Sequence, residues 1–110
     1  VGGLTMAAKI NPTTLKWRHD GKYADGTPIA PEDFGRWEIE LNGEHVFSIP
    51  VGWDQDGDYE TPIADMDLKE GEYTLRMRLV TARGVESPWS SATHFVIGRV
   101  PAAPFDLAVE

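Results

Sequence analysis

Apolar and polar residues alternate along several stretches of this chain. Between Trp37 and Leu41 the apolar residues are separated by Glu38 and Glu40, and the stretch 73–79 repeats the pattern. A period of two with one apolar face is typical of half-buried antiparallel strands. No stretch of about a dozen residues shows the helical period of about 3.6 residues, so the pattern predicts an all-β chain.

Turn signals separate these alternating stretches. The chain holds 11 glycines and 8 prolines among 110 residues. Asn42 and Gly43 stand between two apolar runs and form a dipeptide that favours a hairpin turn. Placing strands between the turn signals predicts seven of them, at residues 4–9, 14–18, 36–41, 46–49, 59–65, 73–82 and 92–97.

Seven short strands without helices predict a seven-stranded antiparallel β-sandwich, in which two sheets bury their apolar faces against each other. The chain has no cysteine, so packing alone must hold the two sheets together. The predicted core consists of apolar residues from the alternating stretches and one turn: Leu15, Trp17, Trp37, Ile39, Leu41, Leu68, Tyr73, Leu75, Met77, Leu79, Phe95 and Ile97.

The charge balance narrows the classes of partner. The chain carries 10 Lys and Arg against 18 Asp and Glu, which gives a formal net charge of −8. Nucleic acids and anionic membranes attract clustered positive charge, so we expect neither as a partner. No run approaches the roughly 18 apolar residues of a membrane span, so we expect no membrane insertion. The chain opens at Val1 without signal-peptide features, and we expect it to be part of a longer protein.

Several groups of residues resemble a fibronectin type III domain. Residues 15–17, Leu-Lys-Trp, resemble its second strand, whose Trp is a central core residue. Residues 24–39 resemble the stretch that leads into and begins its third strand, and residues 84–90 resemble its last loop. The resemblance extends over residues 3–98 and implies an immunoglobulin-like sandwich.

A further part of the resemblance is a tyrosine corner. Leu68, Gly71 and Tyr73 resemble this motif, in which the phenol hydroxyl bonds back to the backbone upstream. The spacing from Leu68 to Tyr73 is one residue shorter than usual, and Glu70 replaces the common proline. These departures concern the geometry of the corner rather than the fold.

The end of the sequence carries a second resemblance. Residues 101–109 resemble the linker and first strand of another such domain, and residues 3–6 hold the corresponding place at the front. The expected organisation is one domain over residues 1–98, followed by a linker and the first strand of a further repeat over residues 99–110. The alternative is a proline-rich segment that frays.

Glu38 and Glu40 are the strongest candidates for catalysis. Same-face neighbours on a strand lie about 7 Å apart, a carboxylate separation that also occurs in glycosidases. The resemblance places Arg76 and Arg78 on the adjacent strand, and two acids opposite two bases indicate cross-strand ion pairs. It also places Trp89 near these arginines, where a cation–π contact is expected. We therefore expect no enzyme, with catalysis by the two glutamates as the alternative.

Metal-ligating residue types are scattered. Asp54, Asp56 and Asp58 alternate as calcium ligands do, but the surrounding residues do not fit a helix–loop–helix calcium loop. Repeated acids in a solvated turn explain them. The histidines stand in separate stretches, whereas zinc needs three or four convergent ligands. We expect neither a metal nor a cofactor.

Loops hold the candidate binding residues, because binding in sandwich folds is grafted onto loops at one end. The longest predicted loop covers residues 20–34, and the alternative there is a variable connection stiffened by prolines. The ring of Trp53 either binds a partner or packs back onto the domain. The candidate ligand-binding residues are Lys22, Tyr23, Asp25, Trp53, Arg83 and Glu86.

The resemblance implies a non-catalytic module. We expect a structural and interaction unit that acts as a spacer within a larger extracellular protein or a phage tail protein, such as a host-specificity component. Its expected partners are neighbouring domains of the same chain and a protein or glycan surface. The alternative is a domain that binds a cell-surface glycan or receptor through its loops, since fold alone does not fix function.

Overall fold

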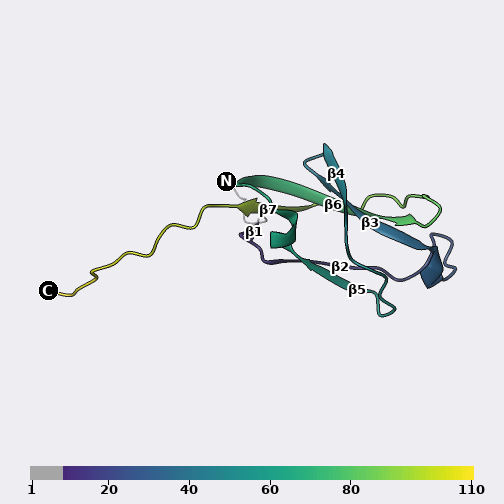
Figure 1. Ribbon diagram of the computed structural model, residues 1–110, viewed down its shortest axis with the longest axis horizontal. Coiled ribbons are helices and arrows are strands. Elements are labelled where there is room, and N and C mark those ends of the chain that lie inside the picture. Colours follow the sequence, from purple (N-terminus) through teal and green to yellow (C-terminus); the bar gives the residue numbers. More distant parts are fainter. Residues whose placement is uncertain (1–8) are drawn as a thin grey trace.

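The computed structural model describes residues 9–110, and in this range the chain consists of strands and loops without an α-helix (Figure 1). Two short 3-10 helices, Pro31–Asp33 and Ile63–Met66, interrupt the strands. No helix in the described range is long and apolar enough to cross a membrane. The seven strands are β1 (Lys9–Ile10), β2 (Thr14–Arg18), β3 (Phe34–Leu41), β4 (His45–Ile49), β5 (Asp58–Pro62), β6 (Gly71–Thr81) and β7 (Thr93–Ile97).

The strands form two sheets. The larger sheet has five strands in the order β1-β7-β6-β3-β4, and the smaller sheet pairs β2 with β5. The pairs are antiparallel except for β1 and β7, which run parallel with Lys9 beside Phe95. The prediction of a purely antiparallel arrangement is therefore wrong at this edge. A parallel pair needs a long connection, and here nearly the whole domain lies between the two strands.

Aromatic side chains connect the two sheets, which Figure 1 shows as separate layers. Trp17 of β2 meets Trp37 of β3 edge to face, with 5.7 Å between ring centroids. Tyr59 of β5 stacks on Trp17 at 5.6 Å and contacts Trp37 at 4.9 Å. Trp37 is only 2% exposed, so this aromatic cluster is the centre of the packing between the sheets.

The core follows the alternating stretches most closely in the larger sheet. Seven predicted core residues are buried there: Trp37, Ile39, Leu41, Leu75, Met77, Leu79 and Phe95. Five others pack against the core but are only partly buried: Leu15, Trp17, Leu68, Tyr73 and Ile97. The pattern missed five buried residues: Ile29, Ile49, Tyr59, Ile63 and Val80.

Strand β5 is shorter than predicted. The sequence pattern predicted a strand over residues 59–65, but β5 ends at Pro62 and a 3-10 helix follows over Ile63–Met66. Proline has no N–H to donate to a ladder, so it ends the strand pairing. Ile63 is 5% exposed, and the short helix therefore keeps this side chain inside the domain. The first predicted strand, residues 4–9, lies almost wholly outside the described residues.

The hairpin between β3 and β4 is confirmed. Asn42 and Gly43 adopt φ values of 54° and 74°, a left-handed conformation that favours these two residue types. The N–H of Glu44 donates to the carbonyl oxygen of Leu41 at 3.1 Å. The N–H of Thr74 in β6 donates to Oδ1 of Asn42 at 2.8 Å, which fixes the turn to the neighbouring strand.

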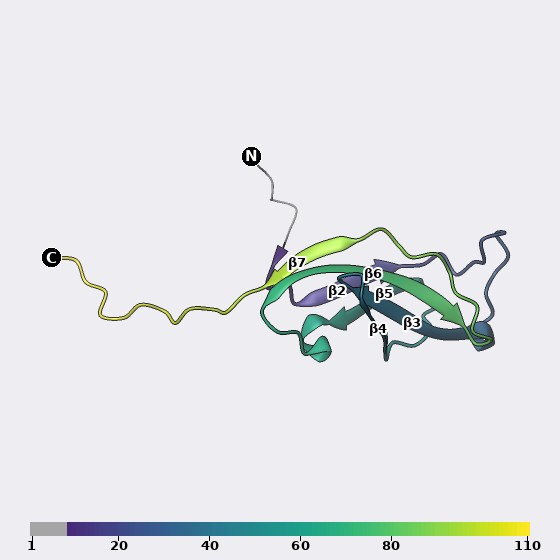
Figure 2. The same cartoon turned by 90° about the horizontal axis from the view of Figure 1, so that it is seen from above.

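Residues 99–110 extend away from the sheets beyond the end of β7, as two perpendicular views show (Figure 1, Figure 2). This segment contributes to the long axis of the molecule, whose extents are 69 × 29 × 22 Å. Phe105, Leu107 and Val109 are 85%, 93% and 101% exposed. The segment forms no strand here, and its assignment to a further repeat stays a prediction.

Candidate functional site

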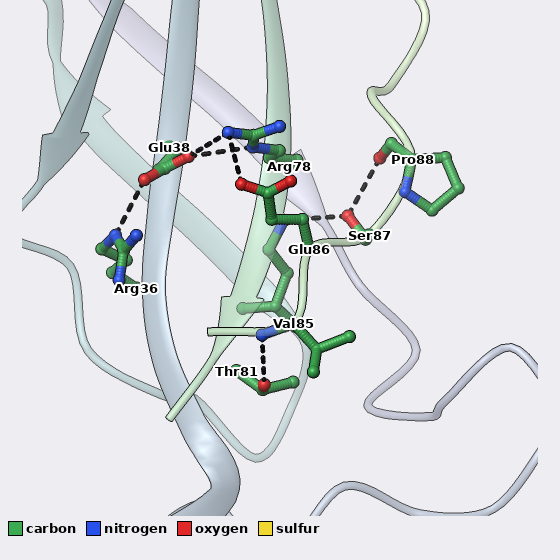
Figure 3. A network of polar contacts seen from close by, with 9 residues as sticks. Arg36, Glu38, Arg78, Thr81, Val85, Glu86, Ser87 and Pro88 are labelled. Carbon is green, nitrogen blue, oxygen red and sulfur yellow. Dashed lines mark hydrogen bonds and ion pairs between the residues drawn. The ribbon is translucent and has the colours of Figure 1, made fainter. Parts of the chain in front are cut away.

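Charged side chains of β3 and β6 pair directly across the strands. The register sets Glu38 opposite Arg78 and Glu40 opposite Arg76. Nη2 of Arg78 lies 2.7 Å from Oε1 of Glu38, and Nε of Arg76 lies 2.5 Å from Oε1 of Glu40. Nε of Arg36 donates to the second oxygen of Glu38 at 2.8 Å (Figure 3). The predicted cross-strand ion pairs are confirmed.

Glu38 is held in its ionised form. Its residue is only 8% exposed, which is rare for a carboxylate unless it is paired. The hydrogen bond from Arg78 holds the pKa of Glu38 below its ordinary 4.5 against the effect of burial, and Arg36 acts in the same direction as Arg78. A general acid needs the opposite shift, because it must keep its proton near neutral pH. The arrangement favours a structural role for Glu38.

Trp89 covers Arg76 and Arg78, the two arginines of these cross-strand ion pairs. The guanidinium carbon of Arg78 lies 4.2 Å from the centroid of the indole ring, and that of Arg76 lies 5.2 Å from it. Arg78 also reaches Oε2 of Glu86 through Nη2 at 3.0 Å. The expected contact of Trp89 with the arginines is confirmed, and the guanidinium groups lie between carboxylates and an aromatic ring.

Two serines fix the segment that carries Trp89. The N–H of Leu79 donates to Oγ of Ser87, and the N–H of Met77 donates to Oγ of Ser90, both at 3.0 Å. Pairing of β6 with β7 extends only as far as Leu75. The serine hydroxyls therefore accept hydrogen bonds from N–H groups of β6 in the part that does not pair with β7. These bonds satisfy the backbone of β6 and position Trp89.

A groove with a volume of about 460 Å³ lies between the loop after β2 and the turn after β6. Ile29 and Leu79, which are 7% and 5% exposed, contribute apolar side chains to its lining. Two segments about sixty residues apart in the sequence thus meet in one concave surface. Four of the six predicted ligand-binding residues line it: Lys22, Tyr23, Arg83 and Glu86.

Tyr23 is tied to the wall of this groove. Its hydroxyl donates to Oδ2 of Asp33 at 3.2 Å, and its N–H donates to the carbonyl oxygen of Thr27 at 2.8 Å. Partial burial of the ring and the Asp33 carboxylate raise the pKa of the Tyr23 hydroxyl. Tyr23 is therefore a neutral hydrogen-bond donor at neutral pH, positioned by its own loop.

Asp25 shapes the loop and does not line the groove. The N–H and Oγ1 of Thr27 donate to Oδ1 of Asp25 at 3.0 and 2.7 Å. These bonds lower the pKa of Asp25, with the side-chain bond from Thr27 as the larger cause. The carboxylate closes a local turn, an ordinary use of Asp in loops.

Trp53 also lies apart from the groove lining. Its ring is half-buried and packs against Phe34, with 5.8 Å between centroids, and against His19 at 6.4 Å. A side chain added at Gly21 would meet the same ring at 3.7 Å. Of the two interpretations of Trp53, this placement favours packing back onto the domain.

The side chain of Asp54 forms hydrogen bonds inside its own turn, the acidic turn over residues 54–58. Its Oδ2 accepts hydrogen bonds from the N–H groups of Asp56 at 3.2 Å and Asp58 at 3.3 Å. Within residues 9–110, no three His, Asp or Glu side chains converge in a geometry that could hold a metal ion. The carboxylate of Asp54 thus serves turn formation, and that of Asp58 pairs with Arg18 at 2.9 Å.

Sequence reasoning did not single out most of the other groove residues. Ile29 and Asp33 are two of them, and both line the groove together with the predicted residues. The sequence does hold one signal for Ile29: it is an isolated isoleucine in a polar loop. Such a side chain is expected to pack against an apolar surface of the domain. Pairing that loop with the turn at Val85 required the fold.

Comparisons with protein-family models, with curated proteins and with solved structures give no match. The resemblance to fibronectin type III domains therefore depends on the residues that carry it, and the function must be argued from the geometry described above.

Proposed function

We propose that this chain is a fibronectin type III-like, immunoglobulin-like β-sandwich that serves as a non-catalytic structural and interaction module. Its role is that of a spacer in a larger extracellular or phage tail protein, with neighbouring domains of the same chain as its partners. The observation that carries the proposal is the ladder of Glu38, Glu40, Arg76 and Arg78 under Trp89. The strongest candidates for acid–base chemistry are all engaged in holding strands together.

The arrangement of the strands supports the sandwich part of the proposal. A five-stranded and a two-stranded sheet joined by Trp17, Trp37 and Tyr59 fit a two-layer fold with one core. The hydroxyl of Tyr73 donates to the carbonyl oxygen of Lys69 at 2.7 Å, so the predicted bond to the backbone upstream is present. A bond of this kind is expected of a tyrosine corner, so it supports the proposed resemblance despite the shorter spacing.

The net charge of −8 fits a role outside nucleic acid and membrane binding. Like-charged modules repel one another weakly in bulk, which keeps a long array of domains soluble. A virion or extracellular location accords with a fold that uses no cysteine and is therefore indifferent to redox conditions.

An amide nitrogen–proton NMR spectrum tests the proposal. It is recorded for the chain alone, then with calcium chloride, then with surface polysaccharide prepared from candidate bacterial hosts. A spacer gives dispersed peaks that do not move with either addition. Peaks of Lys22, Tyr23 and Arg83 that shift with polysaccharide would contradict the spacer role and assign the domain to glycan recognition.

The groove favours this second candidate function. It gathers Lys22, Tyr23, Arg83 and Glu86 from two loops, which is how sandwich folds build recognition surfaces. A glycan- or receptor-binding domain would use these four residues, whereas Asp25 and Trp53 would support their loops. Calcium-dependent shifts confined to residues 54–58 would instead revive the metal interpretation of the acidic turn.

A further inference from the structure

Both asparagines of the chain end a strand pairing in the same way. Asn11 and Asn42 adopt left-handed φ values of 49° and 54°, which asparagine tolerates better than most residues. The N–H of each donates to a strand carbonyl oxygen at 2.8 Å, that of Val96 for Asn11 and that of Thr74 for Asn42. Oδ1 of each also accepts a strand N–H at 2.8 Å, from Gly98 for Asn11 and from Thr74 for Asn42. The side-chain amide thus replaces a backbone carbonyl where the main chain turns away from its partner strand.

The two asparagines differ in the residue that follows them. Asn42 precedes Gly43, whereas Asn11 precedes Pro12. The backbone nitrogen that follows an asparagine can attack the side-chain amide, and glycine hinders this attack least because it has no side chain. Proline has no N–H, so its nitrogen cannot react in this way. Asn42 therefore has the chemistry of a deamidation site, and Asn11 is a control for it within the same chain.

Water has free access to this part of the turn. Asn42 and Gly43 are both exposed, and a Cβ placed on Gly43 would meet nothing within 4 Å. Neither steric cover nor burial therefore protects the reacting atoms. Any protection must come from the hydrogen bonds of the Asn42 side chain.

We propose that Asn42 is a site of spontaneous deamidation that these hydrogen bonds hold closed in the folded domain. The nitrogen of Gly43 attacks Cγ of Asn42, and the bond between Cγ and Nδ2 breaks. Nδ2 leaves as ammonia with the proton of the Gly43 N–H, and a five-membered succinimide remains. Water then opens the ring at one of its two carbonyl carbons and gives aspartate or iso-aspartate. This modification goes beyond the proposed spacer role and does not depend on it.

The fold holds the Asn42 side chain away from the attacking nitrogen. Oδ1 accepts the N–H of Thr74, and Nδ2 donates to the carbonyl oxygen of Glu72 at 3.4 Å, so both ends of the amide are bound to β6. These bonds must break before Cγ can turn towards Gly43. The turn lies beyond the last pair of β3 with β6, and β4 is an edge strand (Figure 1). The turn can therefore leave β6 in a local opening that spares the core.

The two products differ in their effect on the turn. Aspartate keeps the length of the main chain and keeps an oxygen where Thr74 donates its N–H. Iso-aspartate carries the main chain through Cγ, which adds a methylene to the turn and removes Oδ1 from its position. Formation of iso-aspartate thus makes the opening of the turn permanent.

Mass spectrometry of peptide fragments tests the site. The chain 1–110 is incubated in mildly alkaline buffer, with and without enough guanidinium chloride to unfold it. We expect Asn42 to convert at least about tenfold faster in the unfolded chain, because only open molecules react. Asn11 should stay unchanged in both samples. Equal rates for Asn42 in the two samples, or a rate in denaturant no higher than that of Asn11, would overturn the proposal.

The amide peak of Thr74 in an NMR spectrum tests the consequence. The iso-aspartate product is separated, refolded and compared with Asn42→Asp, which is the matched control because it loses the same amide at unchanged main-chain length. We expect a shifted Thr74 peak and a lower melting temperature in the iso-aspartate form alone. A Thr74 peak at the same position in both proteins would contradict the loss of the hydrogen bond. The polysaccharide test of the spacer role is unaffected by either result.

Discussion

Glu38 is a charged residue that is almost fully buried and that forms an ion pair between two strands. Both of its carboxylate oxygens accept hydrogen bonds, one from Arg78 and one from Arg36, although its residue is 8% exposed. A buried carboxylate is tolerated only when it is paired in this way. The side chain of Arg78 is 18% exposed and pairs with both Glu38 and Glu86.

Glu38→Gln should destabilise the fold by about 1.5–3 kcal/mol, because a neutral amide removes the buried carboxylate shared by Arg36 and Arg78 and leaves Arg78 only Glu86, whose side chain is 51% exposed. Urea denaturation monitored by Trp fluorescence measures the change. Asp58→Asn is the matched control, since its pair with Arg18 is exposed and exposed pairs contribute little. Equal losses in the two variants would show that burial of the ladder does not matter.

The stability of the domain should depend on pH through the same residue. The pKa of Glu38 is lowered in the folded state, so its contribution is fully present above its ordinary 4.5 and is lost as pH falls through the folded pKa. The free energy of unfolding should therefore fall less steeply below about pH 4.5 in Glu38→Gln than in the native chain. Parallel pH profiles for the two proteins would contradict this.

At the scale of elements, strand β3 fits against β6 only because one residue lacks a side chain. The register shifts between Phe34 and Arg36, with Gly35 in between. A Cβ at Gly35 would lie 2.4 Å from the carbonyl oxygen of Val80 and 2.5 Å from that of Thr81. Since both contacts are with backbone, no side chain can move to make room.

Gly35→Ala is therefore expected to cost about 1–3 kcal/mol of stability, the usual range for overpacking. Gly52→Ala is its control, because a Cβ there meets nothing within 4 Å. Thermal denaturation followed by circular dichroism compares the two variants. A Gly35→Ala melting temperature equal to that of Gly52→Ala would show that β3 and β6 can separate at no cost.

The two sheets depend on their aromatic contacts to different extents. Trp37 is 2% exposed and touches Trp17, Tyr59, Phe34 and His19, whereas Trp17 is only partly buried. Trp37→Ala should cost about 3–5 kcal/mol and come close to unfolding the domain. Trp17→Ala should cost less. A larger loss for Trp17→Ala, measured by urea denaturation, would contradict this account of the core.

The strands could be predicted where the evidence was local. Alternation of apolar residues predicted β3 and β6, and the Asn42–Gly43 turn predicted β4, which forms a hairpin with β3. The parallel pairing of β1 with β7 had no local signal, because it joins residues more than eighty positions apart. The end of β5 was misjudged because the apolar period continued past Pro62, where the missing N–H stops the ladder.

At the scale of the whole molecule, the candidate site is a product of the fold. Lys22 and Tyr23 come from one loop, and Arg83 and Glu86 from another, and only the packing of β6 beside the first loop brings them together. Their residue types were a reason to select them, but residue type carries no information about how close they lie in space. The position of Trp53 was undetermined for the same reason, since its partners Phe34 and His19 are distant in sequence.

In the proposed function, the acids of β3 serve structure and not catalysis. Carbon-13 NMR of the side-chain carboxyl of Glu38, followed through an acid titration of the native chain, tests this directly. The salt ladder predicts a pKa for Glu38 below its ordinary 4.5. A pKa raised towards neutrality would show a protonated acid at the centre of the ladder, and the chain would then have to be reconsidered as an enzyme.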